Sequence, residues 1–82
     1  MAVNYTKSAQ RDMKRVSRAD ADTIMAAIDE LAISGLGDVV KLHGLSPPAW
    51  RLRVGNFRIV FRREAGTLWV LGVGDRKNVY RG

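Results

Sequence analysis

Arginines are concentrated in one short stretch of this sequence, Trp50–Phe61, which reads WRLRVGNFRIVF. Its middle dipeptide, Gly55-Asn56, is short enough for the two-residue turn of a β-hairpin. With such a turn, Arg53 directly opposes Arg58 on the neighbouring strand. Like charges that face each other across two strands destabilise a hairpin by roughly 0.2 kcal/mol or more. An unfavourable pair of this kind indicates that an anion binds there.

The arginines of this stretch are predicted to share one face of the hairpin. Successive side chains of a strand point to opposite faces, so the apolar residues at 50, 52, 54, 57, 59 and 61 share the other face. The arginine side is predicted to carry Arg51, Arg53, Arg58 and Arg62 together with Val60, Trp69, Leu71 and Val73. A guanidinium offers a flat fork of donors that matches phosphate oxygens, and an apolar floor beside it suits a stacked base. For any single arginine, the alternative is a solvated side chain with no further role.

The net positive charge lies entirely in the second half of the chain. Residues 1–40 hold five Lys/Arg and six Asp/Glu, whereas residues 41–82 hold nine and two, so the net charges are −1 and +7. A field of this sign attracts a polyanion such as nucleic acid, or an acidic protein. The absence of cysteine excludes disulfides and thiolate metal sites. With no apolar run long enough to span a membrane and no metal-ligand spacing, we expect a cytoplasmic protein with neither metal nor cofactor.

The first half predicts the elements that must cover the apolar side of this hairpin. Ala2–Tyr5 is a candidate strand, and Thr6 is a candidate N-cap for a helix over Lys7–Val16. Ser17 opens a variant of the capping box, and the apolar stripe of the second helix ends at Gly35. This half therefore predicts a helical hairpin whose apolar face needs a sheet.

The sequence of the second half contains strand-like runs that predict this sheet. A short extended piece over Val39–Leu42 and a proline-containing loop precede three strand-like runs, Trp50–Val54, Phe57–Glu64 and Thr67–Val73. The separating dipeptides are short enough to make the runs an antiparallel meander. The 82 residues are too few for more than one domain, so residues 1–82 are expected to form a single unit. The prediction is an α+β fold: a short N-terminal strand, a helical hairpin, then an antiparallel β-meander with both helices on one face of the sheet.

Residues 50–80, with the preceding Lys41–Leu45, closely resemble the RelE toxins of the RelE/ParE toxin–antitoxin superfamily. The most specific part is W-R-L-R-V-G-N-F-R-I-V-F followed by V-L-G-V-G-D-R-K-N-V-Y. A looser resemblance covers nearly the whole chain and implies the same order of strand, helices and antiparallel sheet. It also implies a type II toxin that cleaves mRNA in the ribosomal decoding site without a metal, inhibits translation, and is held inactive by a cognate antitoxin.

The resemblance assigns roles to individual residues. Arg51 and Arg53 match the basic pair of the first meander strand, and Arg58 matches the arginine after the turn. The near-terminal Tyr80 would accept the proton of the RNA 2′-hydroxyl. Stabilisation of the charge on phosphorus would come from the matching arginines, Arg53, Arg58 and Arg76. The RNA itself would be contacted by Arg51, Arg62, Trp69 and Lys77. The general acid is unassigned, because an arginine does not give up its proton.

Two other functions stay open at this point. One is a ParE-like or catalytically silent member that inhibits a protein such as DNA gyrase through the same scaffold, and the other is a basic RNA-binding module without chemistry. Retention of Arg76 and Tyr80 favours the nuclease. Arginine at 51 and 53, where the family often has lysine, keeps the ParE-like function open, since fold alone does not decide between them.

Overall fold

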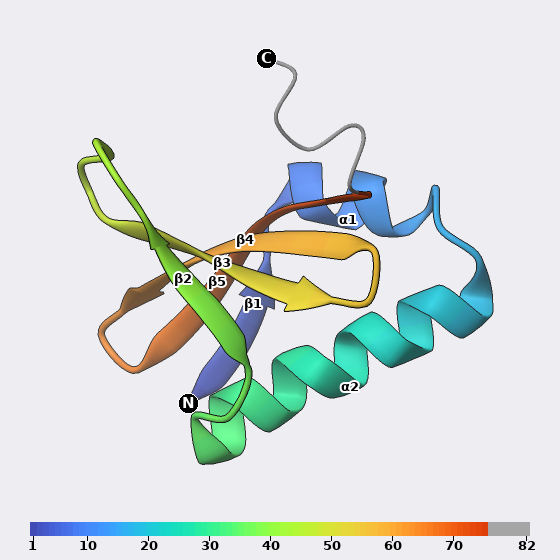
Figure 1. Cartoon of the computed structure of the whole chain (residues 1–82), viewed down its shortest axis with the longest axis horizontal. Helices are drawn as coiled ribbons and strands as arrows, with labels where there is room; N and C mark the ends of the chain where they lie inside the picture. The colour runs from blue at the N-terminus through green and yellow to red at the C-terminus, as the bar shows by residue number, and fades with distance from the viewer. Residues whose placement is uncertain (76–82) are drawn as a thin grey trace.

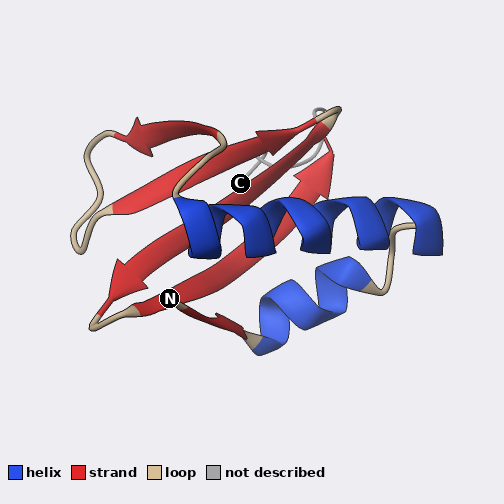
Figure 2. Cartoon of the chain, turned by 90° about the horizontal axis from the view of Figure 1, so that it is seen from below, coloured by secondary structure: helices blue, strands red, loops and turns tan. Residues whose placement is uncertain are grey.

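A computed structural model describes residues 1–75 of the chain as two helices packed on a five-stranded sheet (Figure 1). Both helices lie on the same face of the sheet, so the predicted α+β architecture is confirmed (Figure 2). The strands lie side by side in the order β1-β5-β4-β3-β2. No helix within residues 1–75 is long and apolar enough to cross a membrane. The elements are β1 (Ala2–Tyr5), α1 (Lys7–Met13), α2 (Arg18–Ser34), β2 (Asp38–Leu42), β3 (Ala49–Val54), β4 (Phe57–Glu64) and β5 (Thr67–Asp75).

Each helix begins at the predicted N-cap. The Thr6 hydroxyl accepts a hydrogen bond from the Ala9 amide, and the Ser17 hydroxyl accepts one from the Asp20 amide, both at 3.1 Å. Helix α1 ends at Met13, three residues before the predicted end, because its last turn tightens into an i→i−3 hydrogen bond from the amide of residue 15 to the carbonyl of residue 12. Helix α2 ends where Gly35 adopts φ 76°, a left-handed conformation natural to glycine.

The predicted three-stranded meander is present and gains a strand at each edge. Strand β2 pairs with β3 in antiparallel register, and β1 pairs with β5 in parallel register from Ala2↔Thr67 to Tyr5↔Val70. The central hairpin has the predicted register, including Arg53↔Arg58. The turn at Gly55-Asn56 therefore sets the arrangement of the arginines.

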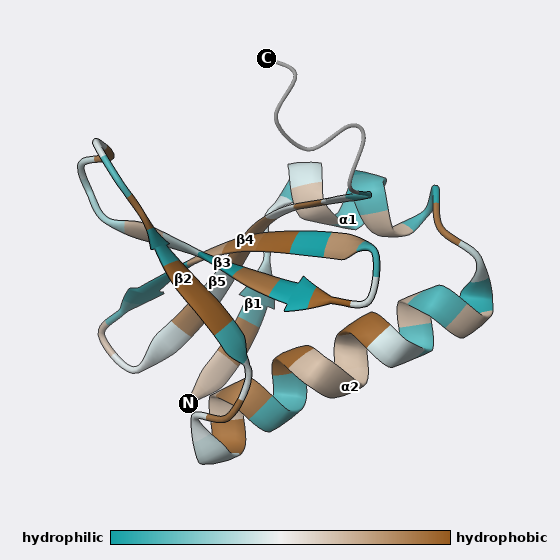
Figure 3. Ribbon diagram, in the orientation of Figure 1, coloured by the Kyte–Doolittle hydropathy of each residue, from teal (hydrophilic) through white to brown (hydrophobic). Residues whose placement is uncertain are grey.

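The core lies between the helices and the covered face of the sheet. Ile24 and Ile28 of α2 are fully buried against Leu52, Ile59 and Phe61 of the central strands. In Figure 3 apolar residues recur along α2 and alternate with polar ones along the central strands. Full burial of such a side chain stabilises the fold by about 1.5 to 3 kcal/mol. No polar or charged residue of the described chain is buried in this core.

Strand β5 contains a β-bulge that simple alternation does not predict. Phe61 pairs with Val70, but the preceding residue Val60 pairs with Gly72. Leu71 is therefore an extra residue in β5, without a partner on β4. Beyond the bulge, the side chains of β5 have exchanged faces relative to the predicted alternation.

The bulge corrects one residue assignment on the arginine side. Val73 pairs with Ile59 on the covered face, and only 8% of its surface is exposed. The prediction that Val73 shares a face with the arginines is therefore wrong, because the extra residue at 71 shifts every later side chain by one position. Val73 belongs to the core instead.

Helix α1 takes the place of a strand along the end of β5. Strand β1 stops at Tyr5, so no strand pairs with the outer edge of β5 beyond residue 70 within the described chain. The Thr6 hydroxyl donates to the carbonyl of Leu71 at 3.2 Å, and the Val73 amide donates to Oδ2 of Asp12 at 2.9 Å. These side chains satisfy backbone groups that would otherwise lack partners, and they fix the end of β5.

Candidate nucleic-acid interface

The sheet face that points away from the helices, called the open face below, begins at the β3–β4 turn with the opposed pair Arg53 and Arg58. Nε of Arg53 lies 3.9 Å from Oδ2 of Asp38, but both side chains are more than 60% exposed, so this ion pair contributes at most about 1 kcal/mol. A cavity of about 70 Å³ is lined by the two arginines together with Gly55 and Asn56. Two guanidinium-bearing side chains thus flank one small hollow at the turn.

Arg51 and Arg62 lie further from the turn and are held closer to the sheet. Arg51 lies between Val40 of β2 and Val60 of β4, and Arg62 lies opposite Trp69 of β5. Both side chains are half-buried, and their Nε atoms are shielded from solvent without a hydrogen-bond partner in the described chain. Packing of Nε against the strands leaves the terminal guanidinium nitrogens as the donors that an anion can reach.

Trp69 provides the aromatic surface of the open face, as predicted. It lies between Asn4 of β1 and Arg62 of β4, and its side chain is half-buried. A flat ring beside a guanidinium can stack a base while the cation contacts the neighbouring phosphate. Within residues 1–75, no helix covers this face (Figure 2).

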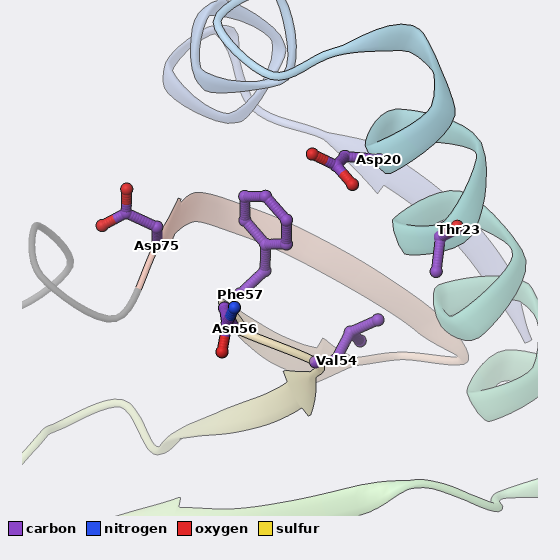
Figure 4. A pocket seen from close by; sticks show the side chains of 7 residues that line it. Asp20, Thr23, Val54, Asn56, Phe57 and Asp75 are labelled. Carbon is purple, nitrogen blue, oxygen red and sulfur yellow. The ribbon is translucent and has the colours of Figure 1, made fainter.

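A larger cavity within residues 1–75 adjoins the same turn and differs in charge. It has a volume of about 650 Å³ and lies between the first turns of α2 and the β3–β4 turn (Figure 4). Val54 and Phe57 give it apolar walls, while Asp20 and Asp75 bring two carboxylates to it. Carboxylates repel a phosphate backbone, so charge rather than size identifies the open face as the candidate RNA surface.

Three of the predicted site residues, Arg76, Lys77 and Tyr80, lie outside the described residues, so their roles stay predictions. The structure brings together the other five, Arg51, Arg53, Arg58, Arg62 and Trp69, on one face. Within residues 1–75, no three His, Cys, Asp or Glu side chains form a group that could hold a metal ion.

Two residues with evident structural roles were not anticipated from the sequence. Asp12 accepts the hydrogen bond from Val73, and no local pattern signals a bond between residues 61 positions apart. Arg63 lies on the covered face against the rings of Trp50 and Phe61. Alternation from Phe61 along β4 is a signal that could have placed Arg63 there.

The fold resembles that of solved RelE structures. A chain of the RelB–RelE antitoxin–toxin complex from Methanococcus jannaschii is 28% identical, with a TM-score of 0.76 over 93% of each chain. The archaeal RelE–RelB complex from Pyrococcus horikoshii OT3 gives 19% identity and a TM-score of 0.77 over 95% of this chain and 97% of that one. The isolated E. coli RelE toxin is 15% identical, with a TM-score of 0.73 over 90% of this chain and 82% of that one. These likenesses define the class as a RelE/ParE superfamily toxin, which confirms the resemblance noted in the sequence.

The sequence as a whole identifies the family. A family model described as the ParE toxin of type II toxin-antitoxin system, parDE, matches residues 3–80. The chain therefore belongs to this family of toxins. No curated protein matched the sequence.

Proposed function

We propose that this toxin cleaves mRNA on the ribosome and that the open face binds the RNA at the scissile phosphate. The observation that carries the proposal is the direct opposition of Arg53 and Arg58 across the hollow at the turn. Like charges opposed across two strands repel each other, and a phosphate between the two guanidinium groups would accept hydrogen bonds from both. The 28% identity to the M. jannaschii complex, whose toxin is a RelE, also supports a RelE-like activity.

The chemistry follows from these residue types. The 2′-hydroxyl oxygen attacks the adjacent phosphorus, the bond to the 5′-oxygen breaks, and the products are a 2′,3′-cyclic phosphate and a 5′-hydroxyl. Arg53, Arg58 and Arg76 would stabilise the charge that develops on the phosphate oxygens, and Tyr80 would receive the 2′-hydroxyl proton. No residue here is assigned to protonate the leaving oxygen, so the ribosome must help to position the RNA and exclude water.

Cleavage assays on purified components test the proposal. The toxin should cut mRNA efficiently on ribosomes, without added metal, and cut the same RNA poorly when ribosomes are omitted. Primer extension locates the cuts, and end analysis should find 2′,3′-cyclic phosphates. Efficient cutting of naked RNA at matched concentration would contradict the role of the ribosome. A 3′-hydroxyl product would indicate a different attacking group and would remove Tyr80 from its role.

A cognate antitoxin is the second partner that we propose. The solved relatives include RelB–RelE antitoxin–toxin complexes, and the charge of +7 over residues 41–82 would attract an acidic segment as readily as RNA. An antitoxin segment rich in Asp and Glu would then cover part of the open face or displace the residues around Tyr80. Such an antitoxin should compete with RNA in a fluorescence-polarisation assay. A ternary complex with unchanged RNA affinity and activity would refute inhibition by occlusion.

The family model supports one other function, inhibition of a protein target such as DNA gyrase. It describes ParE toxins, and it matches nearly the whole chain. A gyrase supercoiling assay with the purified toxin separates the two functions. Inhibition of supercoiling without ribosomal cleavage would favour the ParE-like function, and cleavage without inhibition would favour the nuclease.

A further inference from the structure

A second basic cluster lies on the covered face, past the end of α2. Arg63 places its guanidinium carbon 5.2 Å from the ring centroid of Trp50 and 5.5 Å from that of Phe61. The two rings stack with centroids 6.1 Å apart and planes inclined by 23°. Phe61 is fully buried and Trp50 half-buried, whereas Arg63 is exposed. Figure 2 shows the β2–β3 loop and the β4–β5 turn extending beyond α2 at this end of the sheet.

Lys41 adds a second cation to this cluster. It lies directly opposite Trp50 in the β2–β3 register, so both side chains point to the same face, and Lys41 is exposed. Neither Lys41 nor Arg63 forms an ion pair with a carboxylate of residues 1–75. The indole of Trp50 is therefore flanked by two cations whose charge the described chain does not neutralise.

The aromatic floor prepares Arg63 to bind an anion. Stacking uses the flat face of the guanidinium and leaves its N–H edges for a ligand. A side chain already held against two rings also loses less conformational freedom when it binds than a freely rotating one. The geometry thus offers a planar fork of donors, in contact with two rings, on the same face as an ammonium group, which suits the oxygens of a phosphate.

The position of the cluster limits what the ligand can be. Arg63 lies on the covered face, whereas Arg51, Arg53, Arg58 and Arg62 lie on the open face, so the sheet separates the two sets of cations. One extended RNA strand that crosses the open face does not reach the other side of the sheet. A folded RNA that encloses the protein reaches both.

We propose that Lys41, Arg63 and Trp50 form a second phosphate-binding site for folded RNA that surrounds the toxin, distinct from the strand that is cleaved. This inference rests on the proposed function, because the ribosome supplies such an RNA. An acidic protein segment could also bind the two cations, but a single segment would not account for cations on both faces of the sheet. The planar fork and the adjacent indole favour phosphate and base over a carboxylate side chain.

Two charge-matched variants test the site. K41Q/R63Q removes two positive charges from the cluster, and K7Q/K14Q removes two exposed positive charges from α1 and its C-cap as a control. Binding is measured to 70S ribosomes that carry a 2′-O-methyl mRNA and to a 2′-O-methyl octanucleotide alone, neither of which can be cleaved. We expect K41Q/R63Q to bind ribosomes at least about tenfold more weakly. The slope of log K against the logarithm of the salt concentration should become less steep by roughly 0.9 for each phosphate contact that is lost. Octanucleotide binding by this variant and ribosome binding by the control should stay within about twofold of the unaltered protein.

Several results would overturn the inference. The proposed site would be refuted if K41Q/R63Q kept its ribosome affinity, or if K7Q/K14Q lost as much ribosome affinity as K41Q/R63Q. Lower affinity for the antitoxin with unchanged ribosome affinity would assign the cluster to a protein partner. Should K41Q/R63Q fail to fold by circular dichroism, R63K, which keeps the charge without the planar fork, should lose about threefold in ribosome affinity, and no loss would refute the site. Because no probe is cleavable, these results do not depend on the toxin being a nuclease.

Discussion

The two faces of this sheet are made by the same five strands and yet have opposite physical roles. On the covered face apolar side chains form the core together with the helices, and the described core contains no charge. The open face carries four arginines, two of them directly opposed across β3 and β4. Burial stabilises the first face, whereas repulsion weakens the second. In a domain of this size, stability and recognition are therefore divided between alternate residues of the same strands.

The largest expected effect tests the covered face. Phe61→Ala removes a fully buried ring and should lower the free energy of unfolding by about 3 to 5 kcal/mol. That loss is comparable to the total stability of a small domain, so the variant should be largely unfolded at 37 °C. Urea denaturation followed by circular dichroism measures the change.

A matched change on the open face is the control for this experiment. Arg53→Ala alters an exposed side chain of the adjoining strand, and the free energy of unfolding should change by no more than about 0.5 kcal/mol. If Arg53→Ala destabilises the protein as much as Phe61→Ala does, the division between the faces is wrong.

The next prediction has opposite signs for activity and stability. Arg58→Ala removes a proposed phosphate donor and should reduce ribosomal cleavage at least about 100-fold, the usual effect of losing one donor to a developing oxyanion. The same change relieves the opposition to Arg53, so stability should be unchanged or rise by roughly 0.2 to 1 kcal/mol. Thermal melts and cleavage assays on one preparation measure both quantities, with Lys7→Ala as a surface control. Retained activity, or a loss explained entirely by unfolding, would refute phosphate binding at this pair.

A smaller effect tests whether the helix layer also supports the open face. Asp12→Asn weakens the charge-assisted hydrogen bond from the Val73 amide, and we expect a loss of about 1 to 3 kcal/mol in stability. Hydrogen exchange of the Val73 amide should accelerate more than that of the paired amides nearer the β4–β5 turn. Cleavage should also fall, since the end of β5 leads directly to Arg76. Unchanged exchange at Val73 would show that Asp12 does not fix this part of the strand.

The smallest effect concerns alkaline pH. Burial, and then the nearby carboxylate of Asp29, raise the pKa of Tyr5 above its ordinary value of 10.0. The folded state therefore favours the neutral phenol, so this contribution to stability is fully present below pH 10 and is lost as the pH rises through the folded pKa. In a Tyr80→Phe background, Tyr5 is the only tyrosine, and its absorbance titration should have a midpoint above 10. The melting temperature of Tyr5→Phe should fall less than that of the unaltered protein as the pH rises over the same range. An identical fall in both proteins would contradict a contribution of Tyr5 to this pH dependence.

Local rules predicted the covered face and most of the open face. Alternation and the Gly55-Asn56 turn were sufficient to place Arg53 opposite Arg58, because a two-residue turn leaves one register. They failed at Leu71, where the extra residue is held by a hydrogen bond from Thr6, 65 positions away. The reversal at Val73 follows from that contact, and a tertiary contact of this kind has no signature in the local pattern.

The candidate site was predicted to a similar extent. Arg62 and Trp69 share the open face as expected, since the β4–β5 hairpin is regular as far as Val70. Arg63 received no role from the sequence, although alternation from Phe61 along β4 assigns it to the covered face, and the structure places it over the aromatic rings. The roles of Arg76 and Tyr80 rest on the family resemblance, since neither lies within the described residues.

The pairing of the first strand with the last determines when this toxin can exist as a folded molecule. Residues 2–5 lie in register with residues 67–70, so Val3 and Tyr5 acquire their neighbours on β5 only after synthesis has reached residue 70. Contacts between such distant parts of a chain form late and together. A growing polypeptide that stops short of β5 would lack both the completed core and the cross-strand arrangement around Trp69. The open face is therefore completed only once β5 has been synthesised and has paired with β1.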